Sequence, residues 1–279
     1  MFSDGSGTVH TPNGPALPLI EAQGVSRIYT TVSGETVHAL GKVDLRIADG
    51  EFVCLVGPSG CGKSTFLRLL AGLDPCDGGR LTLAGHPVLG PSSDVGVVFQ
   101  TANLLPWFTV LANVSLPLRV GAGRGRPAPT HQVQDLLAIA GIAEFANKYP
   151  YELSGGMQQR AAIVRALVRD PKVLLMDEPF GALDAQTRHF MQESLLQILE
   201  KERKTVVFVT HGVEEAAFLS TRVVIMASRP GRIREVIPID LPYPRDAATK
   251  TSPEFIKIRA VIEKVVREEF QKLRAAEGV

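Results

Sequence analysis

The chain has 279 residues, of which 45% are hydrophobic and 21% charged, values typical of a folded globular protein and not of a disordered one. Its 30 Lys and Arg residues and 29 Asp and Glu residues leave a formal net charge of +1, so no overall positive field draws it to nucleic acid. The three cysteines lack the paired spacing of a metal site, and their odd number favours reduced thiols without a disulfide. No run reaches the roughly 18 consecutive apolar residues of a membrane-spanning helix, so any membrane role would be peripheral, with the spanning helices on partner chains.

The first segments of the chain are a predicted tail and several strands. Residues 1–18 are rich in Ser, Gly, Thr and Pro and lack the basic start and apolar run of a secretory signal, which indicates a flexible tail. Residues 19–47 have the pattern of short strands with a turn at Ser33 and Gly34. Residues 51–56 form an apolar run that ends at a glycine and is typical of a buried strand.

A phosphate-binding loop follows that buried strand. Residues 57–65 match the pattern G-x-x-x-x-G-K-S/T, and residues 64–72 carry apolar positions at helical spacing, so the loop lies between a strand and a helix as the motif requires. The glycines let backbone N–H groups point inward, and the N-terminus of the helix adds positive potential, so a nucleoside triphosphate is the expected ligand. The candidate nucleotide-binding residues are Gly57, Pro58, Ser59, Gly60, Cys61, Gly62, Lys63, Ser64 and Thr65.

Four side chains of this loop have distinct interpretations. Lys63 offers a compact positive charge for the β- and γ-phosphates, and the hydroxyl of Ser64 suits Mg²⁺, a hard cation that prefers oxygen. Thr65 is expected to support the α- and β-phosphates. Cys61 is interpreted as a small residue that the loop tolerates, with redox control as the alternative.

The middle of the chain is predicted to be a helical subdomain. A strand at residues 95–99 precedes a mostly helical region at about residues 101–169, which a Gly- and Pro-rich loop interrupts at residues 121–129. Within this region Ser154, Gly155 and Gly156 form a turn that opens a helix, which is a second anion-binding N-terminus in the same chain. An ordinary capped helix would give the same local pattern.

Two acidic residues end the next strand. The apolar run at residues 173–176 leads into Asp177 and Glu178, and successive side chains of a strand point in different directions. Asp177 can therefore face Mg²⁺ while Glu178 meets an attacking water as general base, although such acids are also common surface residues. A helical pattern at residues 185–204 and a strand at residues 206–209 follow, and this alternation predicts a parallel sheet.

The last part of the chain begins with strand-like runs at residues 223–227 and 232–237 and a Pro-marked connection at residues 241–245. Apolar residues then recur at helical spacing, which predicts an amphipathic helix docked on the core. This helix lies in a C-terminal extension at residues 241–279, and its apolar stripe consists of Phe255, Ile258, Ile262, Val265 and Phe270.

These motifs occur in an order that resembles the ATP-binding cassette (ABC) ATPases, over about residues 19–236. The resemblance rests on the phosphate-binding loop, the acid-ended strand and the signature Leu-Ser-Gly-Gly-Met-Gln at residues 153–158. It also includes Gln100 after a strand, Gly-Ala-Leu-Asp at residues 181–184, and His211 after the last long strand run. It implies an α/β P-loop NTPase fold with a mostly parallel core sheet, an N-terminal antiparallel β subdomain and a helical subdomain, within an ABC ATPase domain at residues 19–240.

The resemblance implies roles for residues outside the loop. Tyr29 is similar to the aromatic residue that stacks on adenine, and Gln100 to the residue that links Mg²⁺ and the γ-phosphate to the membrane partner. His211 is similar to the residue that holds the γ-phosphate and the water near Glu178, so Glu178, His211 and Gln100 are the expected catalytic residues. ATP and Mg²⁺ are the expected cofactors, and the expected metal-binding residues are Ser64, Gln100 and Asp177.

The family's assembly implies a second set of nucleotide-binding residues. Two cassettes pair head to tail, so the signature segment of one chain closes over the nucleotide on the other chain's loop, and hydrolysis needs a homodimer. The residues expected to contribute from this side are Ser154, Gly155, Gly156, Gln158 and Asp184.

Closer similarity is to the importer subfamily for nitrate, sulfonate and taurine. It rests on Leu-Leu-Pro-Trp at residues 104–107, the segment at residues 177–188, Val-Glu-Glu-Ala at residues 213–216 and Ser-Arg-Pro-Gly-Arg-Ile at residues 228–233. One departure is Gly212, where the family usually has Asp after the histidine. Glycine is a weaker helix cap than an acid, which lowers the expected rigidity of the adjacent His211 segment.

This similarity implies a transport-coupled ATPase, peripheral on the cytoplasmic face of the inner (plasma) membrane. Its homodimer would act on two membrane-spanning permease subunits, with a substrate-binding protein as indirect partner and no nucleic acid. The solute would be a small anion of the nitrate, sulfonate or taurine type. A pyrimidine precursor is an alternative, because the cassette does not touch the solute and its sequence need not encode the solute's identity.

Two other classes fit the sequence less well. A soluble ABC ATPase that remodels nucleic acid or ribosomes usually joins two cassettes or inserts long coiled coils, and neither feature is present. A P-loop kinase would not use the Ser-Gly-Gly turn at residues 154–156.

Overall fold

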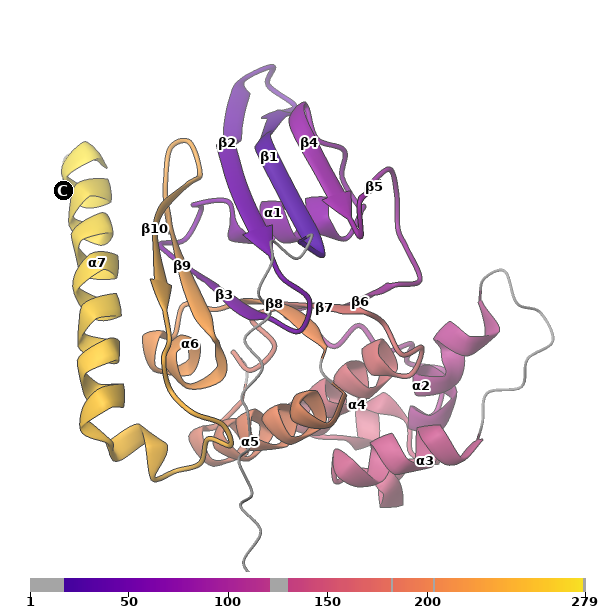
Figure 1. Cartoon of the computed structure of the whole chain (residues 1–279). Helices are drawn as coiled ribbons and strands as arrows, with labels where there is room; N and C mark the ends of the chain where they lie inside the picture. The colour runs from indigo at the N-terminus through magenta and orange to yellow at the C-terminus, as the bar shows by residue number, and fades with distance from the viewer. Residues whose placement is uncertain (1–17, 121–129, 182, 203, 278–279) are drawn as a thin grey trace, which may run out of the picture.

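The polypeptide forms two β-sheets with helices between and around them (Figure 1). The structure is a computed structural model that describes residues 18–120, 130–181, 183–202 and 204–277. The predicted flexible tail, apart from its last residue, and the predicted loop at residues 121–129 lie outside the described residues. The sheet arrangement confirms the predicted fold class, whereas the predicted domain boundaries at residues 19–240 and 241–279 stay predictions.

The N-terminal sheet is antiparallel and has the strand order β2-β1-β4-β5. Its two long strands have 11 and 12 residues, so the short strands predicted in this region are longer than expected. Strands β4 and β5 were not predicted from the sequence, because β4 begins with two glycines and its partner β1 lies far away along the chain. The four strands are β1 (Ile20–Thr30), β2 (Thr36–Ile47), β4 (Gly78–Leu83) and β5 (His86–Pro87).

The core sheet has the strand order β10-β9-β3-β8-β7-β6, in which only β10 runs antiparallel to its neighbour. Every residue of β3 and β8 is buried, so their uninterrupted apolar sequences reflect coverage on both faces of the sheet. The carboxyl ends of β3, β8 and β7 lie side by side, which brings the segments that follow them together. The strands are β3 (Phe52–Val56), β6 (Val95–Val98), β7 (Val173–Asp177), β8 (Thr205–Val209), β9 (Arg222–Ala227) and β10 (Arg232–Pro238).

The helices cover both faces of the core sheet. Helix α1 (Lys63–Leu70) lies between the two sheets, where Phe66 and Leu67 belong to the same apolar cluster as residues of β2 and β3 (Figure 1). On the other side, the helical region predicted at residues 101–169 contains α2, α3 and α4, and α5 and α6 connect strands of the core sheet. Their bounds are α2 (Val110–Arg119), α3 (Thr130–Ile139), α4 (Gly155–Leu167), α5 (Ala185–Glu202) and α6 (Val213–Leu219), with 3-10 turns η1 (Ala143–Phe145) and η2 (Pro150–Glu152).

The C-terminal extension consists of the 3-10 turn η3 (Thr249–Thr251) and the long helix α7 (Pro253–Glu277), which packs against α6 and β9. Phe255, Ile262 and Val265 are buried in the core, as the predicted stripe requires. Phe270 is 44% exposed, so its assignment to the buried stripe was wrong. At 100° per residue, Phe270 lies about 140° around the helix from Val265 and therefore away from the buried face. Glu269 lies on that face and is buried.

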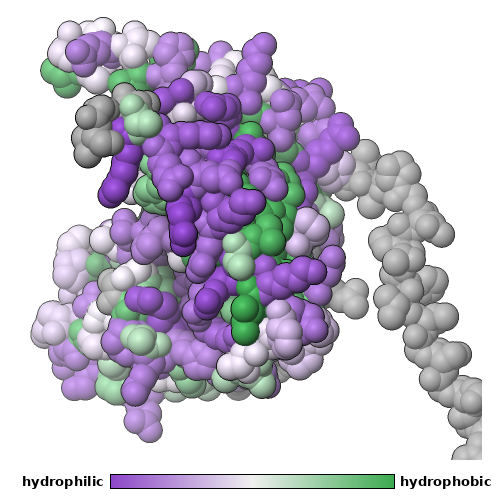
Figure 2. Space-filling view, turned by 90° about the vertical axis from the view of Figure 1, so that its left-hand side faces the viewer, coloured by the Kyte–Doolittle hydropathy of each residue, from purple (hydrophilic) through white to green (hydrophobic). Residues whose placement is uncertain are grey.

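The end of α7 is attached to the edge of the core sheet by ion pairs. Arg234 of β10 donates to the carboxylates of Glu268 and Glu269, and Glu269 also accepts from Lys272 at 3.1 Å. The face that carries α7 is mostly hydrophilic and is crossed by a band of hydrophobic residues (Figure 2). The described residues include no helix that is both long enough and apolar enough to cross a lipid bilayer.

Candidate functional site

The phosphate-binding loop occupies the sharp connection between β3 and α1. Gly62 adopts a φ of 91°, and a Cβ at this position would lie 2.5 Å from a methyl carbon of Leu40. A Cβ at Gly57 would lie 2.5 Å from the carbonyl oxygen of Met226. The glycines predicted for nucleotide binding therefore allow both the backbone conformation and the close contact with β9.

Lys63 is directed into this loop, and only 7% of the residue is exposed. Its Nζ donates to the carbonyl oxygens of Gly57 at 2.8 Å and Pro58 at 3.0 Å, and it lies 3.7 Å from the Sγ of Cys61. These oxygens are neutral, so they satisfy the donors of the ammonium group without cancelling its charge. The loop therefore combines a fixed positive charge with the N-terminus of α1, an arrangement suited to a polyanion.

Two oxygen-bearing side chains, those of Ser64 and Asp177, meet next to Lys63 in the loop. The Ser64 hydroxyl donates to Oδ1 of Asp177, at the end of β7, over 3.0 Å. Burial raises the pKa of the Asp177 carboxyl above its ordinary value, and the nearby charge of Glu178 acts in the same direction, whereas the Ser64 hydrogen bond and Lys63 oppose them. An incoming cation at this position would reverse that balance.

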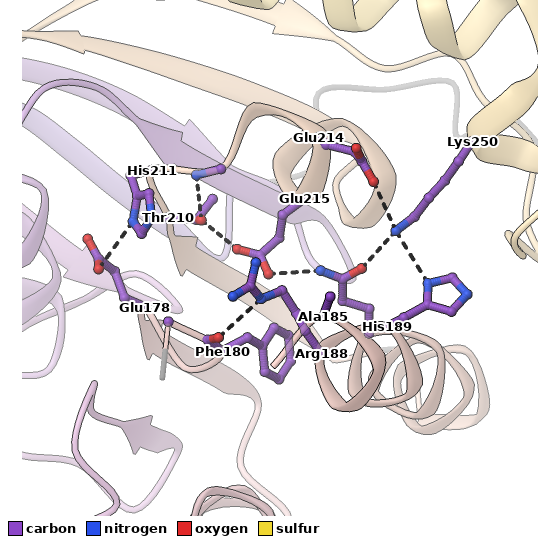
Figure 3. Close-up of a pocket in the computed structure, with 13 residues that line it drawn as sticks. Glu178, Phe180, Ala185, Arg188, His189, Thr210, His211, Glu214, Glu215 and Lys250 are labelled. Carbon is purple, nitrogen blue, oxygen red and sulfur yellow. Dashed lines mark hydrogen bonds and ion pairs between the residues drawn. The ribbon is translucent and has the colours of Figure 1, made fainter. Parts of the chain in front are cut away.

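Glu178 is held between side chains from two neighbouring segments (Figure 3 shows its contact with His211). Its Oε2 accepts from Nε2 of Gln100, after β6, at 3.4 Å, and lies 3.3 Å from Nδ1 of His211, after β8. Glu178 itself has a φ of 45°, which non-glycine residues rarely adopt, and its N–H donates to the Val209 carbonyl at 2.9 Å. Three residues predicted to be catalytic are thus brought together where parallel strands end.

The loop opens into a cavity of about 480 Å³, which Glu178 also lines. Sequence reasoning missed its other walls, which come from β2, the connection between β9 and β10, and α7. The sequence identifies residues 228–233 only as a subfamily marker, and the pattern that predicts the helix α7 gives no sign that this helix reaches the cavity. The unpredicted lining residues are Val37, His38, Ala39, Ser228, Arg229 and Leu273.

Tyr29 does not line this cavity. It pairs across the sheet with Val37, which does, but its hydroxyl donates to Oδ2 of Asp74 at 3.0 Å and the guanidinium of Arg27 lies 4.7 Å from its ring centroid. Adenine stacking by Tyr29 therefore stays a prediction.

The signature segment lies at the start of α4 and does not line the cavity of its own chain. The Ser154 hydroxyl caps this helix by accepting from the Met157 N–H at 3.3 Å, and Gln158 donates to the Pro150 carbonyl at 2.9 Å. A Cβ at Gly156 would lie 3.1 Å from Cγ2 of Thr187, so the start of α4 packs closely on the start of α5.

Asp184 caps α5 in the same way, because its Oδ1 accepts from the N–H groups of Gln186 at 3.1 Å and Thr187 at 3.0 Å. Hydrogen bonds from the side chain and N–H of Thr187 lower the pKa of this carboxyl. The structure therefore places the predicted signature residues and Asp184 next to one another but apart from the phosphate-binding loop.

The comparison with known proteins decides the family. The ABC transporter family model matches residues 40–181. The chain belongs to the ABC transporter family. It is therefore an ATP hydrolase coupled to transport. The matched residues include the phosphate-binding loop and the acid-ended strand.

Individual relatives extend this similarity over most of the chain. The chain is 46% identical to the taurine import ATP-binding protein TauB of Rhizobium johnstonii, and the match covers 89% of this chain and 96% of TauB. It is 44% identical to the aliphatic sulfonates import ATP-binding protein SsuB of Bacillus cereus, over 91% and 96%.

Solved structures support the same conclusion. The ABC protein resembles the dimeric, post-hydrolysis state of the ATP-binding cassette MJ0796 bound to ADP and Pi, with a TM-score of 0.71 and 33% sequence identity. The match covers 80% of this chain and all of that cassette.

Proposed function

We propose that this protein is the ATP-hydrolysing subunit of an importer for a small sulfonate-type anion, and that Glu178 is its general base. The observation that carries the proposal is the position of Glu178 beside the phosphate-binding loop, with Gln100 at 3.4 Å and His211 at 3.3 Å from the same carboxylate oxygen. A carboxylate at this position can accept the proton of a water that attacks the γ-phosphate.

The phosphate-binding loop would hold the triphosphate for this reaction. The hydrogen bonds of the Lys63 ammonium group go to neutral carbonyl oxygens and not to a carboxylate, so its positive charge is available to a phosphate. The N–H groups at the start of α1 add to this positive potential. Moving Lys63 from the carbonyl oxygens of Gly57 and Pro58 to phosphate oxygens would replace neutral acceptors with charged ones, which strengthens its hydrogen bonds.

The residues present also fit Mg²⁺. The described part of the chain contains no cluster of three or more His, Cys, Asp and Glu residues that could hold a metal by itself. Mg²⁺ is commonly held by one or two protein oxygens together with substrate phosphates, and Ser64 and Asp177 supply such a pair. When bound, the cation neutralises negative charge that develops on the phosphates.

The active unit would be a homodimer. Ser154 lies at an exposed helix N-terminus that does not line the nucleotide cavity of its own chain, yet the sequence assigns it to nucleotide binding. A second chain placed head to tail would supply this N-terminus, and the dimeric assembly of the related cassette MJ0796 supports that arrangement. ATP between the two chains would hold them together, and its hydrolysis would remove the contact.

The solute and the partners follow from the relatives. The relatives TauB and SsuB are named for import of taurine and aliphatic sulfonates, so a sulfonate is the favoured solute class. Import requires a pathway across the membrane, so two permease subunits would bind this protein at the cytoplasmic face, and a substrate-binding protein would deliver the solute.

Reconstituted complexes test this proposal. The protein would be co-expressed with the permease and binding protein encoded nearest to it and assayed in vesicles with labelled taurine, a longer alkanesulfonate, nitrate and a pyrimidine precursor. ATP-dependent uptake of the sulfonates, lost in Glu178→Gln, supports the proposal. Uptake restricted to another solute would contradict the sulfonate assignment, and solute-independent ATP hydrolysis without any uptake would contradict the import function.

A further inference from the structure

A second cavity lies on the far side of His211, between the core and the C-terminal extension (Figure 3). It has a volume of about 240 Å³, and its lining begins at Glu178 and His211 and reaches Lys250, which precedes α7. Polar side chains from α5, α6 and η3 meet in its wall, and none of them is used by the hydrolysis mechanism described above.

The first part of this wall replaces the missing cap at Gly212. Gly212 is the N-cap of α6 and has no side-chain hydrogen bond to offer. Its N–H donates instead to Oγ1 of Thr210 at 2.9 Å, and the Thr210 hydroxyl donates to Oε2 of Glu215 in the first turn of α6. In a capping box the acidic side chain of the first turn accepts directly from the N–H of the N-cap residue, whereas here the Thr210 hydroxyl bridges Glu215 and Gly212. Because Thr210 and Gly212 flank His211, these bonds fix both of its neighbours.

The second part of the wall connects Glu215 to the C-terminal extension. Gln192 of α5 is only 3% exposed, and its Nε2 donates to Oε1 of Glu215 at 2.9 Å while its Oε1 accepts from Nζ of Lys250 at 3.1 Å. An amide with a cation on one side and a carboxylate on the other has only one favourable orientation. The hydrogen bonds therefore converge on the Glu215 carboxylate, from Lys250 through Gln192 on one side and from Thr210 on the other.

Lys250 is itself held at several points. Its Nζ lies 3.2 Å from Oε1 of Glu214, 3.4 Å from Nδ1 of His189 and 4.5 Å from the ring of Phe218. Glu214 and Phe218 both belong to α6, so Lys250 contacts that helix directly as well as through Gln192. Buried hydrogen-bond chains of this kind are strongly interdependent, because loss of one member leaves its neighbours unsatisfied.

We infer that Lys250 and Gln192 are positioning residues for His211, and that the C-terminal extension thereby supports ATP hydrolysis. The inference rests on the proposed role of His211 beside Glu178. The chain of contacts compensates for glycine at residue 212: it anchors the start of α6 to α5 and to the extension, and so limits the freedom of the His211 backbone. Lys250 and Gln192 act through Glu215 and Thr210 and touch no substrate.

The test measures steady-state ATP hydrolysis of the complete transporter with Lys250→Met, which keeps the aliphatic contact with Phe218 but removes the charge. We expect kcat to fall about tenfold while KM for ATP stays within about twofold, because nucleotide binding uses the other cavity. Lys250→Arg restores most of the rate. Lys257→Met, at an exposed position of α7, is the matched control and leaves kcat unchanged.

A double-mutant cycle separates this role from a merely structural one. Thr210→Val removes the hydroxyl at the other end of the chain, whereas Thr210→Ser keeps it and serves as its control, and both remain informative if Lys250→Met fails to fold. We expect the effects of Thr210→Val and Lys250→Met on kcat to be far from additive. Additive effects, or normal kcat in a folded Lys250→Met protein, would overturn the inference. A wild-type complex without ATP hydrolysis would instead overturn the proposed function.

Discussion

The imidazole Nδ1 of His211 lies 3.3 Å from Oε2 of Glu178, although the two residues are 33 positions apart in the sequence. The contact exists because β7 and β8 are neighbouring parallel strands, with Asp177 in register with Val209. The carboxyl ends of adjacent parallel strands meet at one edge, which is where α/β sheets generally bind ligands. The site is thus a direct consequence of strand order.

Glu178→Gln should retain ATP binding and lose hydrolysis. The amide keeps the size of the side chain and one acceptor oxygen but cannot take up the proton of a water, so kcat should fall about 100- to 10,000-fold. Stopped-flow nucleotide binding and phosphate release measure the two properties separately. Glu235→Gln, at an exposed position on β10, is the control, and near-normal turnover of Glu178→Gln would contradict the assignment.

Asp177→Asn should stabilise the nucleotide-free protein at neutral pH. Burial raises the pKa of Asp177 in the folded state above its ordinary value of 3.8, so the folded chain binds this proton more tightly than the unfolded chain does. The free energy of unfolding therefore decreases as pH rises from the unfolded pKa through the raised folded pKa, and Asn avoids that loss.

Thermal unfolding as a function of pH measures this effect. The difference in Tm between Asp177→Asn and wild type should appear as pH rises and vanish in acid, while stabilisation by ATP with Mg²⁺ should be lost in the variant. A lower Tm for the variant at neutral pH would show that the Ser64 hydrogen bond outweighs burial.

Cys61 should react slowly with alkylating reagents at neutral pH. Burial raises the pKa of its thiol, although the nearby Lys63 opposes this shift, and the side chain is not exposed. Cys76, which is partly exposed, is the internal reference and should be labelled first. Mass spectrometry of timed samples reports each site. Alkylation of Cys61, once achieved, should block ATP binding sterically, and a fully alkylated protein that still hydrolyses ATP would refute this.

Gly231→Ala should damage the phosphate-binding loop without touching nucleotide. A Cβ at Gly231 would lie 2.3 Å from the Cys61 carbonyl oxygen and 2.6 Å from that of Ala39, both of which are backbone atoms. We expect a loss of about 1–3 kcal/mol in the free energy of unfolding together with weaker ATP binding. Gly90→Ala, where a Cβ meets nothing within 4 Å, is the control for denaturant unfolding. Unchanged stability of Gly231→Ala would contradict the close packing.

The local motifs predicted most of the site, and packing determined the rest. Lys63, Ser64 and Asp177 lie on short segments whose strand and helix context the sequence displays, and their proximity follows from adjacent parallel strands. Leu273 lines the cavity at the phosphate-binding loop only because α7 packs along β10, and this long-range contact leaves no periodic pattern in the sequence. Phe270 was misplaced because it is apolar, although the buried face of α7 continues from Val265 through the polar residue Glu269.

The central claim is that each nucleotide is clamped between two chains, and site-specific crosslinking tests it directly. Ser59 and Ser154 are exposed in the single chain, so cysteines at both positions, in a background lacking Cys54, Cys61 and Cys76, can be joined by a short bifunctional reagent. With Glu178→Gln to retain ATP, the account predicts crosslinked dimers that form with ATP and Mg²⁺ and disappear with ADP. Absence of the crosslink in the transporter while ATP is bound would contradict the account.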